Sequence, residues 1–264
     1  MSERVLVSIE NRVAQVRLNR AVKRNALDLD MFTAIATAQK QLARTGDLRA
    51  VVLSGDGVDF CSGLDIKSVM SSRTAALRLM WKWLPWRTNL AQAVSTGWRD
   101  LAMPVIAAIH GRCWGGGLQI ALGADFRIVH PDASVSVMEG KWGLIPDMGG
   151  TLAMRDIMHR DQAMKLAMTG ETLNAQQALE AGLITQISED PGRAALDLAL
   201  QLAERSPDAV AAVKRLYRKS WNGRGLVLAR ESAYQVRILA GANQRIAARR
   251  QRGDAVDFNP AGRW

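Results

Sequence analysis

Three consecutive glycines, Gly115 to Gly117, are the residues of this chain whose spacing most directly suggests chemistry. They separate a β-like apolar run at 104–109 from a helix-like run at 118–124. A turn of this kind leaves backbone N–H groups unpaired at a helix N-terminus, where the helix dipole favours negative charge and glycine allows close approach. Such groups can hold an oxyanion during a reaction. The same triplet also suits an ordinary tight turn.

A second glycine-containing turn, D-F-C-S-G-L-D-I at 59–66, follows another short apolar run and precedes another helix-like segment. Two such turns can point two N–H groups at one oxygen atom. The sequence leaves open whether they converge.

The elements around these turns follow an alternating pattern. Residues 5–9 and 13–18 alternate apolar and polar side chains and predict a hairpin. Helical spacing over 28–42 predicts a helix that Asp28 or Asp30 caps. Short buried strands are predicted at 50–53, 104–109, 126–129 and 134–137. Strands that alternate with helices favour an α/β fold with mostly parallel pairing.

Two regions depart from this alternation. Residues 71–101 read as helical, with a break at Pro85. From 194 onward the pattern is helical throughout, over 196–203, 208–221 and 226–250. We therefore expect an α/β core over 1–195 and a helical C-terminal region over 196–264 that packs on a neighbouring subunit.

Composition narrows the class of protein. The chain has 264 residues, a net charge of +10 and two cysteines. No apolar run approaches the roughly 20 residues of a membrane span. We expect no signal peptide, because residues 1–4 lead directly into the first predicted strand. The two cysteines do not suggest a disulfide framework, so we expect a cytoplasmic protein. We expect no metal site, because the three histidines are scattered and no metal-binding spacing occurs. The positive charge suits an anionic partner, either nucleic acid or a phosphorylated cofactor, or simply solubility.

Several short motifs together resemble one family. They are L-N-R at 18–20, K-R-N-A-L at 23–27, F-C-S-G-L-D-I at 60–66, P-V-I-A-A-I-H-G at 104–111, G-G-G-L at 115–118, A-D-F-R-I at 124–128 and G-L-I-P at 143–146. In this order and spacing they are similar to the crotonase (enoyl-CoA hydratase/isomerase) superfamily. The resemblance implies a spiral of ββα turns with a helical C-terminal region, assembled as a trimer or a dimer of trimers.

The resemblance also implies the substrate and its contacts. The substrate would be an acyl-CoA thioester, with coenzyme A as part of the substrate and no other cofactor. The N–H groups of Leu64 and Gly116 would bind the thioester oxygen and stabilise it as an enolate. Arg24 and Lys67 are candidate contacts for phosphate or ribose. The full set of substrate-binding candidates is Arg24, Ala26, Cys61, Gly63, Asp65, Ile66, Lys67, Trp114, Gln119 and Trp142.

The acids and bases depart from the hydratase pattern of the family, which has two glutamates. The first position is Gln119 here, and an amide cannot act as a general base. The second is Glu139, whose place between Met138 and Trp142 predicts partial desolvation and a raised pKa. Asp147 matches an aspartate of the dienoyl-CoA isomerases, and it equally suits a turn or the N-cap of a helix that begins near residue 151.

The tryptophans have two interpretations. Trp114 and Trp142 flank the two catalytic motifs and, with Trp81, Trp83 and Trp86, can line an acyl pocket. Trp98 and Trp221 are better explained as core residues.

We therefore favour double-bond isomerisation of an unsaturated acyl-CoA by Glu139, with Asp147 as a second candidate acid. One alternative is hydration of a 2-enoyl-CoA by Glu139 alone, with Gln119 holding the water. Others are an acyl-CoA-binding protein without activity and, ranked lower because no aromatic residues interleave the basic ones, an RNA-binding protein.

Overall fold

The centre of the molecule is a six-stranded sheet with the order β1-β2-β3-β4-β6-β9. The computed structural model describes residues 3–70, 73–82, 84, 87–219, 232–233, 235–237, 240–250 and 253–262. The strands are β1 (Val5–Glu10), β2 (Val13–Leu18), β3 (Ala50–Gly55), β4 (Val105–Ile109), β6 (Phe126–Val129) and β9 (Gln186–Ile187). β1 and β2 form the predicted antiparallel hairpin, and all later neighbours pair in parallel.

A second, smaller sheet lies beside the first. It has the order β5-β7-β8, with β5 (Arg112–Trp114) parallel to β7 (Ser134–Ser136) and β7 antiparallel to β8 (Thr172–Asn174). The sequence analysis did not predict β5, β8 or β9. Each has only two or three residues, too few for an alternating pattern to be visible.

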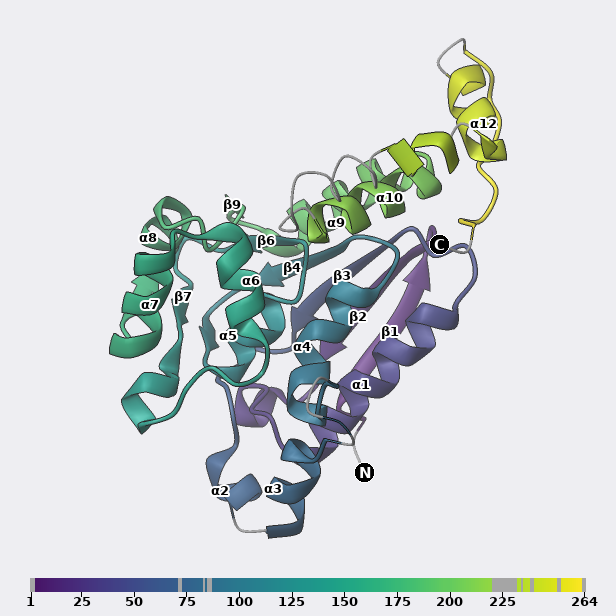
Figure 1. The fold of residues 1–264 in the computed structure, drawn as a ribbon. Helices are drawn as coiled ribbons and strands as arrows, with labels where there is room; N and C mark the ends of the chain where they lie inside the picture. Colours follow the sequence, from purple (N-terminus) through teal and green to yellow (C-terminus); the bar gives the residue numbers. More distant parts are fainter. Residues whose placement is uncertain are drawn as a thin grey trace.

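Helices cover both faces of the large sheet (Figure 1). α1 (Leu29–Arg44) and α4 (Leu90–Asp100) pack on one face, and α9 (Pro191–Ala203) packs on the other. Along β3, Val51 and Leu53 belong to the cluster that contains α1, whereas Val52 belongs to the cluster that contains α9. This double burial explains why the parallel strands are apolar throughout.

The predicted start of α1 is confirmed. The side chain of Asp28 accepts a hydrogen bond of 2.8 Å from the N–H of Met31, so Asp28 rather than Asp30 is the N-cap. Asp28 also forms an ion pair of 2.7 Å with Arg4. The cap therefore joins the beginning of the chain to the first helix.

The remaining elements are short. They are η1 (Ala21–Lys23), α2 (Ile66–Met70), α3 (Arg73–Met80), α5 (Gly116–Ala121), η2 (Met138–Trp142), α6 (Gly150–Ile157), α7 (Arg160–Thr169), α8 (Ala175–Glu180), α10 (Pro207–Arg218) and α12 (Ala242–Arg250). The helix predicted over 118–124 begins two residues earlier, within the glycine triplet. Trp83, Pro85, Trp86 and Trp221 lie outside the described residues. Within the described ranges, no helix is both long and apolar enough to cross a membrane.

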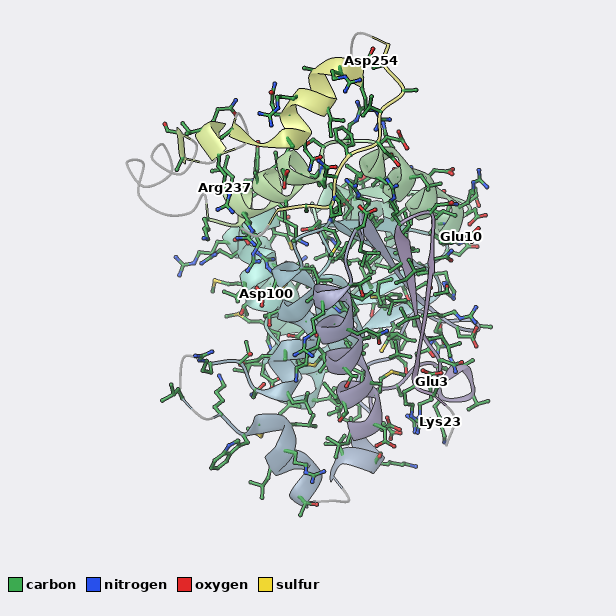
Figure 2. The ribbon with its side chains drawn as sticks, turned by 90° about the vertical axis from the view of Figure 1, so that its right-hand side faces the viewer. Glu3, Glu10, Lys23, Asp100, Arg237 and Asp254 are labelled. Atoms are coloured by element: carbon green, nitrogen blue, oxygen red, sulfur yellow. The ribbon has the colours of Figure 1, made fainter. Side chains whose placement is uncertain are left out.

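The C-terminal helices differ in how closely they are bound to the core. α9 crosses the predicted boundary at 195 and buries Ala195 and Ala199 against the sheet. α10 is joined to the core by an ion pair of 2.7 Å between Lys214 Nζ and Asp125 Oδ2. α12 extends away from the sheet (Figure 1). In Figure 2, Asp254 marks the end of the molecule that carries α12, and Lys23 lies toward the opposite end.

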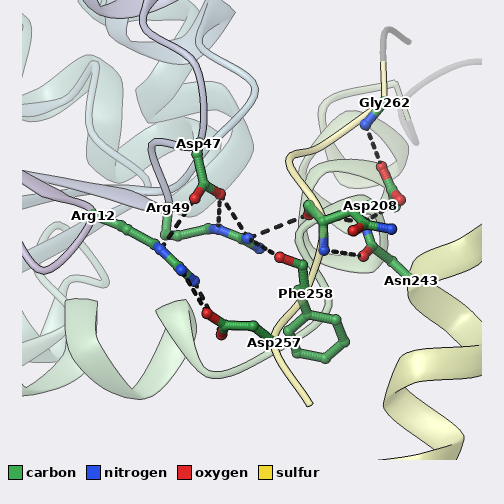
Figure 3. Close-up of polar contacts among 9 residues, drawn as sticks. Arg12, Asp47, Arg49, Asp208, Asn243, Asp257, Phe258 and Gly262 are labelled. Carbon is green, nitrogen blue, oxygen red and sulfur yellow. Dashed lines mark hydrogen bonds and ion pairs between the residues drawn. The ribbon is translucent and has the colours of Figure 1, made fainter.

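The tail after α12 returns to the first hairpin (Figure 3). Arg12 Nη2 lies 2.6 Å from the carboxylate of Asp257, and buried Arg49 donates to the carbonyl of Phe258 at 3.1 Å. Asn243 in α12 donates to Asp208 in α10 at 2.8 Å. Asn243 Oδ1 also accepts from the N–H of Asn259 at 2.8 Å, so α12 is bonded to both α10 and the tail.

Candidate active site

The two glycine-containing turns lie side by side. The N–H of Cys61 donates to the carbonyl of Arg112 at 3.0 Å, and the N–H of Trp114 donates to the carbonyl of Cys61 at 3.0 Å. These two bonds form a short parallel bridge between the turns. The two turns are therefore adjacent in the structure.

Glycine is required where the turns touch. A Cβ atom on Gly117 would lie 2.6 Å from the carbonyl oxygen of Cys61, which is closer than any real contact. A Cβ atom on Gly63 would lie 2.9 Å from the carbonyl oxygen of Trp114, and the φ of Gly63 is +94°. The same Cβ position is 3.7 Å from the nitrogen of Gly116, so the two turns approach within van der Waals distance.

The backbone N–H groups of Leu64 and Gly116 lie at this junction. Among the described residues, the backbone N–H groups of Leu64 and Gly116 have no hydrogen-bond acceptor. Gly116 is the first residue of α5, where a helix leaves its N–H groups unpaired. Leu64 directly follows Gly63, which faces Gly116. Two backbone N–H groups without acceptors on adjacent turns are the donors that an oxyanion hole requires.

A polar network lies next to the glycine triplet. Gln119 in α5 is 1% exposed, and its Nε2 donates to Glu139 Oε1 at 2.6 Å. Its Oε1 accepts from the N–H of Met148 at 2.9 Å and from the N–H of Gly150 at 3.1 Å. Both polar ends of the Gln119 side chain are therefore occupied.

Glu139, in η2, points its carboxyl group at the triplet. A Cβ atom on Gly115 would lie 3.6 Å from Glu139 Oε1. The other oxygen, Oε2, is buried and has no hydrogen-bond partner in the described part of the chain. Burial raises the pKa of Glu139, hydrogen bonds from its own backbone and from Gln119 oppose the rise, and the charge of Asp147 adds to it. A carboxyl group with a raised pKa suits proton transfer near neutral pH.

Asp147 lies in the loop between η2 and α6 and is exposed. The N-cap of α6 is Gly149, which makes no side-chain cap bond, so the capping role predicted for Asp147 is wrong. The charge of Asp147 contributes to the raised pKa of Glu139.

The segment that carries the candidate coenzyme A contacts pairs with the turn at 63–65. The N–H of Leu27 donates to the carbonyl of Gly63 at 2.8 Å, and the N–H of Asp65 donates to the carbonyl of Leu27 at 3.0 Å. This pairing brings the following predicted residues to one region: Arg24, Ala26, Gly63, Asp65, Ile66 and Lys67. Arg24 and Lys67 are exposed there, and Ile66 is half-buried.

The acidic members of this region have structural partners. Asp65 Oδ2 lies 2.8 Å from Arg20 Nη1. Partial burial opposes ionisation of Asp65, but hydrogen bonds from Arg20 and from the N–H of Ser68 lower its pKa overall. Arg24 Nη1 is 3.5 Å from the buried carboxylate of Asp59. Asp65 therefore orders the turn and is ionised at neutral pH.

The side chain of Cys61 points into the interior of the protein. It is fully buried, and its Sγ donates to the carbonyl of Asn25 at 3.1 Å. Burial raises the pKa of the Cys61 thiol to about 12, so the thiol is neutral. Its backbone N–H and C=O both bond to the neighbouring turn. The backbone of Cys61 therefore joins the two turns, and its predicted place among the substrate contacts stays a prediction.

The tryptophans divide between core and rim. Trp98 is fully buried, as predicted. Trp114 is half-buried, and its Nε1 donates to Ser134 Oγ at 3.1 Å. Trp142 is 63% exposed, and the next large apolar side chains, Leu144 and Ile145, are exposed as well. The loop that follows Glu139 therefore presents an apolar surface.

Sequence reasoning missed several residues that hold the site. Asn25 is buried, and its Nδ2 donates to the carbonyls of Asp56, Asp59 and Phe60. Asparagine is a residue type whose side chain often bonds to the backbone of a turn, which is a signal that the sequence does carry. Met148 and Gly150 act through backbone N–H groups, for which the sequence carries no signal.

Comparisons with known proteins identify the family of the chain. A model of the enoyl-CoA hydratase/isomerase family matches residues 8–245. Carnitinyl-CoA dehydratase of Salmonella typhi is 30% identical over 221 residues, which cover 83% of this chain and 81% of that protein.

Solved structures share the fold. An enoyl-CoA hydratase from Mycobacterium tuberculosis H37Rv is 28% identical, with a TM-score of 0.80 over 92% of this chain and 93% of its own. An enoyl-CoA hydratase from Bacillus anthracis has a TM-score of 0.87 over 97% and 99% of the two chains, and at 24% identity it supports the fold alone. The expected crotonase-like α/β fold is thus confirmed. The chain belongs to the enoyl-CoA hydratase/isomerase family, and it is an enzyme of that family.

Proposed function

We propose that this enzyme moves the double bond of an unsaturated acyl-CoA and that Glu139 carries the proton. The observation that supports this proposal most strongly is the asymmetry of the Gln119–Glu139 pair. Gln119 has no basic group, whereas Glu139 has a buried oxygen without a partner among the described residues. One carboxylate is sufficient to take up a proton and return it elsewhere.

The proposed reaction needs two proton transfers and no other reactant. With a 3-enoyl-CoA, the Glu139 carboxylate removes a proton from C2, and the electron pair moves into the carbonyl to give a dienolate. The N–H groups of Leu64 and Gly116 donate to the oxygen on which the charge develops. Protonation of C4 by Glu139 then gives the 2-enoyl-CoA and restores the carboxylate.

Coenzyme A would lie along the paired segments 24–27 and 63–67. Arg24 and Lys67 are exposed there and carry the charge that phosphate groups attract. Trp114 directly precedes the glycine triplet and Trp142 ends η2, which carries Glu139, and both would border the acyl group. The positive net charge of the chain would favour the approach of such an anion.

Addition or removal of water by Glu139 is the second candidate. The similarity to a carnitinyl-CoA dehydratase favours it. Gln119 Oε1 already accepts two backbone hydrogen bonds, so Gln119 could hold a water molecule through its second Nε2 hydrogen. That single contact would replace a second glutamate.

Mass-resolved turnover in deuterated water separates the two reactions. A panel of 2-enoyl-CoA and 3-enoyl-CoA thioesters would be incubated with the enzyme. Deuterium incorporation and double-bond migration without addition of water would support the isomerase proposal. A gain of D₂O, about 20 daltons, would contradict it and support hydration.

We also propose that the chain assembles as a trimer or a dimer of trimers. α10 exposes Val213 and Tyr217, the latter 72% accessible, and α12 extends from the core (Figure 1). Such features suit burial against another subunit. Light scattering after size-exclusion chromatography would measure the mass, and a monomer would contradict the proposal.

A further inference from the structure

We infer that Gln119 is a positioning residue for Glu139 and that its fixed amide selects the carboxyl oxygen which exchanges the proton. The inference rests on the proposed role of Glu139. It starts from the three hydrogen bonds that the Gln119 side chain makes to other residues, Met148, Gly150 and Glu139.

The orientation of the amide follows from its partners. The backbone N–H groups of Met148 and Gly150 are donors, so the atom that faces them must be the acceptor Oε1. If the amide were flipped, its NH₂ group would face two further donors, and three buried groups would lose their bonds. Nε2 therefore points at Glu139 and not away from it.

The fixed donor distinguishes the two oxygens of Glu139. Oε1 accepts the hydrogen bond of 2.6 Å from Gln119 and cannot carry a proton on that side while the bond exists. Oε2 is buried and without a partner in the described part of the chain, so a proton bound by Glu139 resides there. The amide thereby keeps one oxygen ready for exchange with substrate.

A carboxylate at position 119 would behave differently. One of its oxygens could still accept from Met148 and Gly150, but the other would face Glu139 Oε1 across the present 2.6 Å gap. Two carboxylates at that separation share a proton and titrate as a pair. The amide instead lets Glu139 titrate as a single group.

Two substitutions test the inference without reference to turnover. Enzyme labelled with ¹³C at the glutamate carboxyl carbon would be titrated by NMR, with the Glu139 signal assigned through Glu139→Gln. Gln119→Met removes the donor, and we expect the pKa of Glu139 to rise because the carboxylate loses a hydrogen bond. Gln119→Glu keeps an acceptor for Met148 and Gly150, so it serves even if Gln119→Met fails to fold. We expect two coupled steps in place of one, with the later step above the wild-type pKa.

Gln39→Met is a matched control, because Gln39 is also buried and donates to the carbonyl of Val94 through Nε2. It should leave the Glu139 titration unchanged. With an active substrate, Gln119→Met should lower kcat by about tenfold or more, as expected for loss of a hydrogen bond to a charged group, and Gln119→Glu should move the pH profile.

The outcomes separate this inference from the proposed function. A Glu139 titration that is unaffected in both Gln119→Met and Gln119→Glu would overturn the positioning role. The same shift of the titration in Gln39→Met would also overturn it, since the effect would then reflect general loosening. If the titration responds as expected while the thioester panel shows only water addition, the positioning role stands and the isomerase proposal fails.

Discussion

The charge of Asp147 adds to the rise in the Glu139 pKa that burial causes. The relationship links an exposed carboxylate on the loop before α6 to a half-buried one in η2. Because the charge of Asp147 raises the pKa of Glu139, removing that charge should shift the pH dependence of the enzyme in a known direction.

Asp147→Asn should lower the pKa of Glu139, because a neighbouring negative charge is removed. The acidic limb of the kcat/KM profile should therefore move to lower pH. Asp147→Glu retains the charge and serves as the control. A limb that stays in place in Asp147→Asn would mean that solvent screens the charge.

Glu139→Gln should lower turnover by about two orders of magnitude or more, because it removes a positioned acid–base group. Affinity for the acyl-CoA, measured by calorimetry, should change little. Glu180→Gln is a suitable control, since Glu180 is an exposed helical residue whose side chain accepts from Gln176 in the same helix. Unchanged turnover in Glu139→Gln would remove Glu139 from the mechanism.

The same substitution should affect stability in a pH-dependent way. The pKa of Glu139 is raised in the folded state, so its contribution to stability is present below the ordinary glutamate pKa and is lost as pH rises through the folded-state pKa. The Tm of Glu139→Gln relative to wild type should therefore increase from acidic to neutral pH. A difference in Tm that is constant with pH would show that Glu139 is not desolvated.

The contact between the two turns can be tested by a steric change. Gly117→Ala would place a Cβ atom 2.6 Å from the Cys61 carbonyl and force the turns apart. We expect about 1–3 kcal/mol of lost stability, typical of overpacking, and a lower kcat because the Leu64 and Gly116 N–H groups separate. Gly46→Ala is the control, because a Cβ atom there has nothing within 4 Å. Wild-type kcat in Gly117→Ala would argue against a rigid oxyanion hole.

The tail of the chain offers a test away from the site. Asn243→Ala removes bonds to Asp208 and to both the N–H and the carbonyl of Asn259. Hydrogen exchange in residues 253–262 should become faster, since these bonds hold the tail against α12 (Figure 3). Asp197→Ala, which removes an exposed ion pair within α9, should have no such effect. Equal exchange in wild type and Asn243→Ala would show that Arg12 and Arg49 suffice to hold the tail.

Much of the fold could be predicted from local sequence patterns. The hairpin, α1 with its Asp28 cap and the strands at 50–53 and 126–129 were predictable, because side-chain alternation and capping preference act over a few residues. β5, β8 and β9 were not, since a strand of two or three residues is defined by the neighbour with which it pairs.

The candidate site could also be predicted only in part. The glycines of both turns and Glu139 stand out in the sequence because of their residue types. The bonds of Gln119 to Met148 and Gly150 do not, because they join backbone groups about thirty positions away, which every residue type except proline offers. The burial of the Cys61 side chain could not be predicted either, because its motif identifies the turn but not the direction of the side chain.

The bonds that Arg12 and Arg49 form with the tail can be made only when synthesis of the chain is nearly complete. Arg12 precedes Asp257 by 245 positions, and Arg49 precedes Phe258 by 209. Both arginines therefore leave the ribosome long before their partners are made. A chain that stops a few residues short of residue 257 would contain every candidate active-site residue and still leave the buried guanidinium of Arg49 without the carbonyl groups it binds.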